Sequence, residues 1–187
     1  MKTLPFIMTL ALAACASPAQ PRDGRDKELS LSGSFQSYSS GGSSGSSSAF
    51  LISPRFGFFV VEGLELEPEA LLMLASGSDP VYVVNANVSY NFVASKQRVP
   101  FLLIGYGRAN TVPFFNVPIR QMGFGVGVFN VGAGVKIYLS QDIALRIEYR
   151  FQRFYGEGEP TTSADYSFTE RIDTRIHMVQ FGFSVLL

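Results

Sequence analysis

Residues 129–151 read FNVGAGVKIYLSQDIALRIEYRF, and apolar residues occupy nearly every odd position of this stretch. The even positions carry mostly Gly or polar side chains, among them Lys136, Arg146, Glu148 and Arg150. This alternation predicts two β-strands joined by a turn at 140–142, because successive side chains of a strand point to opposite faces. In a water-soluble barrel the apolar face turns inward, whereas in a membrane barrel it faces lipid. The function depends on which of the two arrangements holds.

The composition restricts the class of protein. The chain has 187 residues, which suits one domain, and 15 basic residues balance 15 acidic ones. Without a net positive charge or a basic run, no field attracts the protein to nucleic acid. We therefore expect no nucleic-acid partner.

The N-terminal residues have the features of an export signal. Met1 and Lys2 provide a short positive start, and the mostly apolar run 4–14 is too short to cross a bilayer as a helix, which takes about 20 residues. We expect a signal peptide at 1–14, a periplasmic linker at 15–27 and a membrane β-barrel at 28–187. No transmembrane helix is expected after cleavage.

The end of this signal contains the only Cys of the chain, Cys15. Residues 12–15, LAAC, resemble the lipobox of bacterial lipoproteins, in which the Cys is lipidated and becomes the first mature residue. Ala16 after it resembles the pattern of lipoproteins sorted to the outer membrane. The alternative is ordinary cleavage at a site with small residues at 14 and 16. Under either interpretation a single Cys forms no internal disulfide.

The remaining chain divides into eight segments with strand-like alternation. We predict strands at 28–37, 50–60, 64–74, 81–93, 100–108 and 172–187, and two more that cover 129–151, apart from its turn, and the immediate extensions of that stretch. The fifth segment alternates too weakly for its faces to be assigned. Apolar residues in 123–128 have the opposite phase to those that follow, which predicts a β-bulge near Phe129.

The connections between these strands alternate in length. The short ones are 61–63, 94–99 and 140–142, the long ones are 39–48, 110–122 and 156–170, and the brief turn 76–80 breaks the pattern. In an up-and-down barrel every second connection lies at the same end, so the short ones share one end with both termini. Outer-membrane barrels have this asymmetry, with short periplasmic turns and longer outer loops. We expect both termini in the periplasm.

Three features favour lipid outside the barrel. Strands near ten residues suit a tilted membrane strand of about 9–11 residues better than a soluble strand of about 5–6. The polar face is rich in Ser, Asn and Gly, which fit the narrow lumen of an eight-stranded barrel. The sequence also ends in apolar alternation. The pattern predicts an all-β, eight-stranded antiparallel up-and-down transmembrane β-barrel, with a lipocalin-like soluble barrel as the alternative.

Two segments, NVGAGVKIYLSQDIALRIEYRF (130–151) and MVQFGFSVLL (178–187), resemble the outer-membrane β-barrel family of OmpA- and OmpX-like eight-stranded proteins. The first resembles the Gly-rich strand, turn and Arg/Glu strand of the family, and the second resembles its terminal assembly signal. Family barrels usually end in Phe, where this chain has Leu187. The resemblance implies a place in the bacterial outer membrane, contact with its lipid and lipopolysaccharide, and insertion by the barrel assembly machinery. It says little about function.

With the apolar side chains facing lipid, charged residues of both signs fall on the inward face. The four acids are Glu65, Glu67, Glu69 and Glu148, and the four bases are Arg55, Lys136, Arg146 and Arg150. Buried charges are tolerated only when they are paired and hydrogen-bonded. The equal numbers therefore predict a salt-bridged plug that closes the lumen. The alternative treats the row of three Glu as a cation path or a catalytic acid cluster.

Enzyme motifs are scarce in this sequence. The single His, His177, leaves a His-based metal site without partners, and no nucleophile elbow, HExxH motif or P-loop occurs. Lipid A deacylases of this fold carry a Ser two residues after a His, where this chain has Val179. We expect no catalytic site, cofactor or metal, and we expect His177 at the outer membrane interface.

Together these features predict a non-enzymatic outer-membrane barrel with a closed lumen and a structural or surface-interaction role in adhesion or envelope integrity. An extracellular partner would bind through the loops 39–48, 110–122 and 156–170. Apolar residues of 110–122 either make such a contact or pack over the barrel mouth. The alternative functions are a lipid-modifying enzyme of the lipid A deacylase or acyltransferase type and a narrow small-solute channel.

Overall fold

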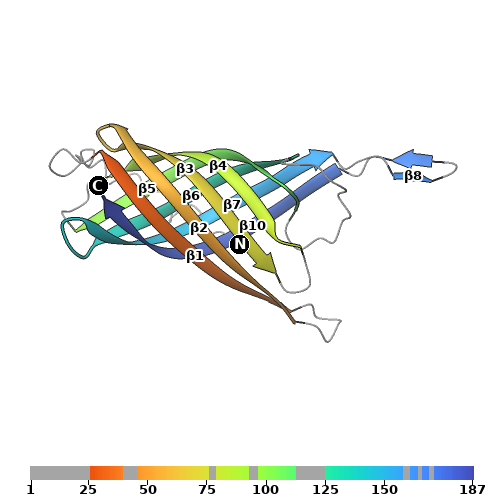
Figure 1. Cartoon of the computed structure of the whole chain (residues 1–187), viewed down its shortest axis with the longest axis horizontal. Helices are drawn as coiled ribbons and strands as arrows, with labels where there is room; N and C mark the ends of the chain where they lie inside the picture. The colour runs from red at the N-terminus through yellow and green to blue at the C-terminus, as the bar shows by residue number, and fades with distance from the viewer. Residues whose placement is uncertain are drawn as a thin grey trace, which may run out of the picture.

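Eight strands close into one antiparallel barrel in the computed structural model (Figure 1). The structure describes residues 26–39, 46–75, 79–92, 97–112, 125–157, 161–163, 166–168 and 171–187. The barrel strands are β1 (Lys27–Ser39), β2 (Ser46–Val61), β3 (Leu64–Ala75), β4 (Val81–Asn91), β5 (Arg98–Ala109), β6 (Val126–Tyr138), β7 (Ile143–Glu157) and β10 (Arg171–Leu186). Their order around the barrel is β1-β10-β7-β6-β5-β4-β3-β2. The predicted fold class is confirmed.

Several strands are longer than the sequence pattern indicates, mainly at the end with the long connections. Part of the Ser-rich tract joins the sheet, since Ser37–Ser39 of β1 pairs with Ser46–Ser48 of β2. The predicted loop 156–170 contains a small hairpin of β8 (Thr161–Ser163) and β9 (Tyr166–Phe168). At the other end, Gly63 has φ 75°, a left-handed conformation that Gly adopts without strain, and it makes the tight turn between β2 and β3. No helix in the described ranges is long and apolar enough to span a membrane.

The predicted bulge near Phe129 is wrong. β6 keeps an unbroken register with β5 and β7 through this residue, and the side chains of Val126 and Val128 point into the lumen in line with Asn130. The apolar phase changes because the lumen itself turns apolar toward the loops, not because the strand slips. An irregular register occurs instead between Phe59 and Val61, where β2 pairs with β3.

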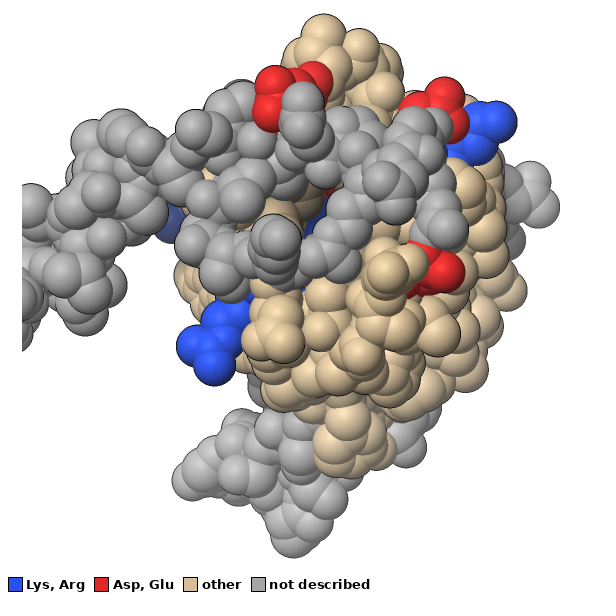
Figure 2. All heavy atoms as spheres, turned by 90° about the vertical axis from the view of Figure 1, so that its left-hand side faces the viewer, with Lys and Arg blue, Asp and Glu red and all other residues tan. Residues whose placement is uncertain are grey.

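The outward face of the barrel is a continuous apolar surface. Large exposed apolar side chains lie on each of the eight barrel strands, among them Leu31, Phe58, Leu66, Val84, Ile104, Val131, Tyr149 and Phe183. Figure 2, which views the end that carries the short turns, shows uncharged side chains along the wall and charged ones at the rim. The weak alternation of β5 has a clear cause, because Val99, Phe101 and Leu103 point inward while Leu102 and Ile104 point outward.

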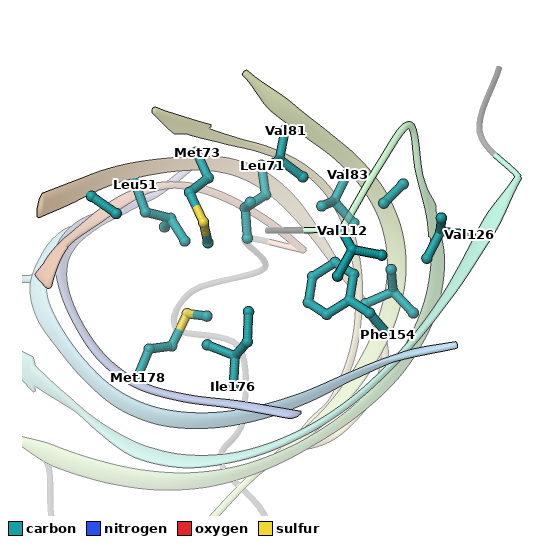
Figure 3. Close-up of a cluster of buried hydrophobic side chains, with 13 residues drawn as sticks. Leu51, Leu71, Met73, Val81, Val83, Val112, Val126, Phe154, Ile176 and Met178 are labelled. Carbon is teal, nitrogen blue, oxygen red and sulfur yellow. The ribbon is translucent and has the colours of Figure 1, made fainter. Parts of the chain in front are cut away.

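Inside, the lumen is filled by two stacked groups of side chains. The first, here called the ionic layer, consists of Glu28, Arg55, Glu65, Glu67, Glu69, Lys136, Arg146, Glu148 and Arg150. The second, here called the apolar layer, lies toward the long connections and is shown in Figure 3; it consists of Ala49, Leu51, Leu71, Met73, Val81, Val83, Ala109, Val112, Val126, Val128, Phe154, Ile176 and Met178. Val112 comes from the predicted loop 110–122, so this loop contributes at least one side chain to the barrel mouth.

Candidate functional site: the ionic layer of the lumen

The structure brings together all eight charged residues that the sequence pattern places on the inward face. They come from β2, β3, β6 and β7, and each is at most 3% exposed. Their positions follow from strand alternation, since Glu65, Glu67 and Glu69 occupy successive inward positions of β3, and Arg146, Glu148 and Arg150 those of β7.

Glu148 is the acid around which the half of the layer nearer the loops is organised. Its carboxylate lies 2.5 Å from Nη2 of Arg150, 2.6 Å from Nη1 of Arg55 and 3.1 Å from Nη2 of Arg146. Glu69 binds two of the same bases, with 2.8 Å to Nε of Arg55 and 2.6 Å to Nη1 of Arg150. The two acids and two of the bases thus form a closed ring of short ion pairs.

Lys136 organises the half of the layer nearer the turns. Its Nζ lies 2.7 Å from Oε2 of Glu28 and 2.8 Å from Oε2 of Glu65. Arg146 connects this group to the first one, with Nη2 2.9 Å from Glu67 and Nη1 3.7 Å from Glu28. The layer is therefore one network from end to end.

These ion pairs brace opposite walls of the barrel. In the observed strand order, β3 and β7 are separated by three strands on either side, so they face each other across the lumen. Arg146–Glu67 and Arg150–Glu69 both join these two walls. Side chains that meet across the full width of an eight-stranded barrel leave no continuous space along its axis at that level.

Uncharged groups donate further hydrogen bonds to the carboxylates, and Oε1 of Glu65 is the carboxylate oxygen of the layer that accepts none from the described residues. Asn85 and Asn87 each donate to Oε2 of Glu69 at 3.0 Å, and Ser53 donates to its Oε1. Asn91 donates to Glu65 at 3.1 Å, and Ser89 donates to Glu67 at 2.5 Å. Such hydrogen bonds matter because they offset part of the cost of removing each charge from water.

Aromatic and small residues shape the space around the network. The ring of Phe101 lies 4.3 Å from the guanidinium carbon of Arg146, a cation–π contact that stabilises the cation away from water. Room for the polar side chains comes from inward-facing Gly. A Cβ at Gly57 would overlap the carboxylate of Glu65, and a Cβ at Gly105 would overlap the amide of Asn87.

Sequence reasoning missed one member of the network, Glu28. It shares the inward parity of Ser30, Ser32 and Ser34, which is the only local sign of its position. Its partner Lys136 lies 108 residues further along the chain. With Glu28 the layer holds five acids and four bases, so the expected balance of four against four is incomplete, and Lys136 is shared between two acids.

The other predicted positions lie apart from this network. His177 is exposed on the outer face of β10, where its Nδ1 lies 2.6 Å from the hydroxyl of Tyr149. Cys15, the predicted signal peptide and residues 15–25 of the predicted linker lie outside the described residues, whereas Lys27, the last residue of that linker, begins β1. Of the predicted loops, 40–45, 113–122, 158–160, 164–165 and 169–170 also lie outside them. Within those that are described, no cluster of His, Cys, Asp and Glu has the arrangement of a metal site.

Comparisons with known proteins agree on the architecture. The profile of a family described as outer membrane protein beta-barrel domain matches residues 7–185. Neisserial surface protein A is similar in structure with a TM-score of 0.57 and 14% identity, covering 86% of this chain and 96% of its own. The N-terminal β-barrel domain of Pseudomonas aeruginosa OprF gives 0.55 and 13%, with 87% and 98% covered. A de novo designed transmembrane β-barrel gives 0.54 and 12%, with 91% and 100% covered. No curated protein matches the chain.

Proposed function

Because the chain belongs to the family of outer membrane protein β-barrel domains, we propose that it acts in the bacterial outer membrane as a closed, non-enzymatic barrel with a structural or surface-interaction role. The observation that carries this proposal is the filling of the lumen. Ion pairs cross the barrel from β3 to β7, and the apolar layer is stacked on them toward the loops. A rigid, filled barrel supports a surface or an anchor better than a path for solutes.

The two layers oppose conduction for different physical reasons. An ion that enters the ionic layer must break short pairs such as Arg150–Glu69, at 2.6 Å, without water to replace them. An ion that enters the apolar layer loses its hydration shell, and narrow apolar constrictions exclude water by dewetting. Planar-bilayer recordings test this directly, with a general porin in the same membranes as positive control. We expect no steady current from the wild type, and a steady open channel would contradict the proposal.

A lipid-modifying enzyme is the main competing function, and His177 is the residue on which it depends. In the proposed role this ring is an interfacial side chain. Its hydrogen bond to Tyr149 and its tilted contact with Phe151, with the ring centroids 5.0 Å apart, support that role. The test is a fatty-acid release assay on lipid A with the purified wild type and His177→Ala. We expect no release from either protein. Release that depends on His177 would favour the enzyme.

A surface-interaction role requires the long connections to face outward from the cell. The short connections β2–β3, β4–β5 and β6–β7 share one end with the start of β1 and the end of β10, the arrangement of outer-membrane barrels with periplasmic termini. An epitope inserted at 40–45 tests this orientation on intact cells, with the same epitope in the β6–β7 turn at 140–142 as the matched control. We expect labelling of the first and not of the second.

A further inference from the structure

The barrel is closed by the pairing of its first and last strands, and this seam is incomplete. Among the described residues, β1 and β10 pair only from Glu28–Leu186 to Gly33–Phe181. Both strands continue further, β1 to Ser39 against β2 and β10 from Arg171 against β7. Figure 1 shows the two strands diverging toward the end opposite the C-terminus. We call this gap, between 34–39 of β1 and 171–180 of β10, the fork.

The base of the fork is an apolar groove. It has a volume of about 600 Å³ and is lined mainly by Phe35, Phe50, Met178, Val179 and Phe181, together with the polar side chains of Ser34 and His177. Phe35 is 70% exposed and Phe181 58% exposed, both on the outward face of the barrel. Met178 is buried and belongs to the apolar layer of the lumen. The groove is open on the outside of the barrel, and Met178, which is 3% exposed, is the side chain of the apolar layer that lines it.

The side chains along β10 indicate the depth of the fork in the membrane. Outward positions from Val185 up to Val179 are apolar, His177 follows, and the side chain of Arg175 is 64% exposed. Aromatic and His side chains favour the interface and Arg the water beyond it. The base of the fork thus lies in the hydrocarbon region of the membrane, in the half toward the long connections. The other end of the fork reaches the membrane–water interface.

From this geometry we propose that the fork admits an acyl chain of an outer-leaflet lipid, which reaches the apolar layer of the lumen. An apolar groove of this size within the lipid belt is filled by hydrocarbon rather than by water. Met178 and Met73 point toward one another across the lumen (Figure 3), and Met side chains rearrange readily around a guest. The ionic layer below limits how far the chain can enter.

The shape of the fork favours a lipid chain over a strand from another protein. An added strand needs a constant spacing of about 4.8 Å to each neighbour. The two strands of the fork instead approach each other until they pair at Gly33–Phe181, so their spacing is not constant. A flexible hydrocarbon chain fits a tapering space, whereas a strand does not. The inference rests on the outer-membrane location and not on the closed lumen, so a conductance result does not decide it.

Disulfide trapping tests whether the fork is open in the membrane. Continuing the seam register by two residues would place Phe35 opposite Val179, a pairing equivalent to Leu31–Phe183 in the closed part. In a Cys15→Ser background, oxidation of outer membranes should cross-link Leu31→Cys with Phe183→Cys. It should leave Phe35→Cys with Val179→Cys largely reduced, because a disulfide requires close Cα atoms. Equal cross-linking of both pairs would overturn the proposal. Disulfide-linked dimers of Phe35→Cys alone would overturn it in favour of a second copy at the fork.

Fluorescence quenching tests the occupant. The chain contains no Trp, so a single introduced Trp reports alone. In phosphatidylcholine bilayers with chains brominated near their ends, Met178→Trp should lose its emission as strongly as the lipid-facing Val179→Trp. The matched control is Leu103→Trp, whose side chain is equally buried behind an unbroken wall of β4, β5 and β6.

Heat-modifiable migration on a gel checks that each variant has folded, and Ile176→Trp replaces Met178→Trp if the latter does not fold. If Met178→Trp, or Ile176→Trp in its place, keeps its emission in the brominated bilayers as Leu103→Trp does, the proposal is overturned.

Discussion

Replacing Lys136 by Met tests the ionic layer at the point where one base serves two acids. The substitution keeps the length of the side chain and removes its charge, so Glu28 and Glu65 lose partners at 2.7 Å and 2.8 Å. Glu28 retains the longer contact of 3.7 Å to Arg146 and a hydrogen bond of 2.9 Å from Ser30, and Glu65 retains hydrogen bonds from Ser89 and Asn91. The layer then holds five acids and three bases.

The expected loss of stability follows from removing one partner of a buried ion pair, which costs about 3–5 kcal/mol. With a urea dependence of roughly 2 kcal/mol per M, the unfolding midpoint should fall by roughly 2 M. The measurement is a urea titration of the protein folded into lipid vesicles, read by heat-modifiable migration. Lys27→Met is the matched control, because Lys27 is exposed at the start of β1, and it should leave the midpoint nearly unchanged.

A second substitution separates the electrostatic reason from a packing defect. Glu65→Gln removes one of the two acids that Lys136 binds, so in the Lys136→Met background it should raise the midpoint, while in the wild type it should lower it. This change of sign is the signature of two residues that interact directly. Two results would refute the assignment of Lys136 as the base that binds both acids. One is a double variant no more stable than Lys136→Met alone, and the other is a Lys136→Met variant whose midpoint is no lower than that of Lys27→Met.

Three further predictions use similar measurements. Gly105→Ala should destabilise the barrel by about 1–3 kcal/mol, because its Cβ would overlap the side chains of Asn87 and Asn130 on the two neighbouring strands, while Gly156→Ala, where the Cβ meets only ordinary contacts, should have little effect. Phe154→Ala should cost about 3–5 kcal/mol, since this ring is fully buried in the apolar layer; a smaller loss in the urea titration would mean that the layer is loosely packed. If Cys15 is lipidated, palmitate labelling should disappear in Cys15→Ser, and equal labelling of both proteins would remove this prediction.

Strand alternation placed on one face eight of the nine charged residues that the structure describes in the lumen, and strand length, the small residues of that face and the apolar alternation of the last strand oriented it inward. The period of two is local, so Glu65 and Arg146 can be assigned to the inward face without knowledge of their partners. Which ion pairs form depends on strands that are distant in the sequence, such as β3 and β7. Glu28 was missed because it stands at the very start of its strand, where the pattern gives a boundary only to within a few residues.

The apolar layer could not be predicted in the same way. In the stretch 70–74, ALLML, both faces of β3 are apolar, so the sequence does not distinguish Leu71 and Met73, which fill the lumen, from the lipid-facing Leu72 and Leu74. The opposite phase of 123–128 was the visible sign of this layer, and a bulge was the wrong explanation of it. The fork left no sign at all, because the seam depends on a pairing between the first and last strands.

The position of the fork follows from the order of the two layers. The paired part of the seam spans the inward residues Glu28, Ser30 and Ser184 and ends next to Gln180, which accepts a hydrogen bond from Arg55. Beyond it the inward residues of β10 are Met178 and Ile176. Opening the wall beside the ionic layer would expose charged groups to hydrocarbon at a cost of several kcal/mol each, whereas opening it beside the apolar layer brings similar surfaces together. The change from a charged to an apolar lumen thus explains why β1 and β10 pair beside the ionic layer and why they separate beside the apolar layer.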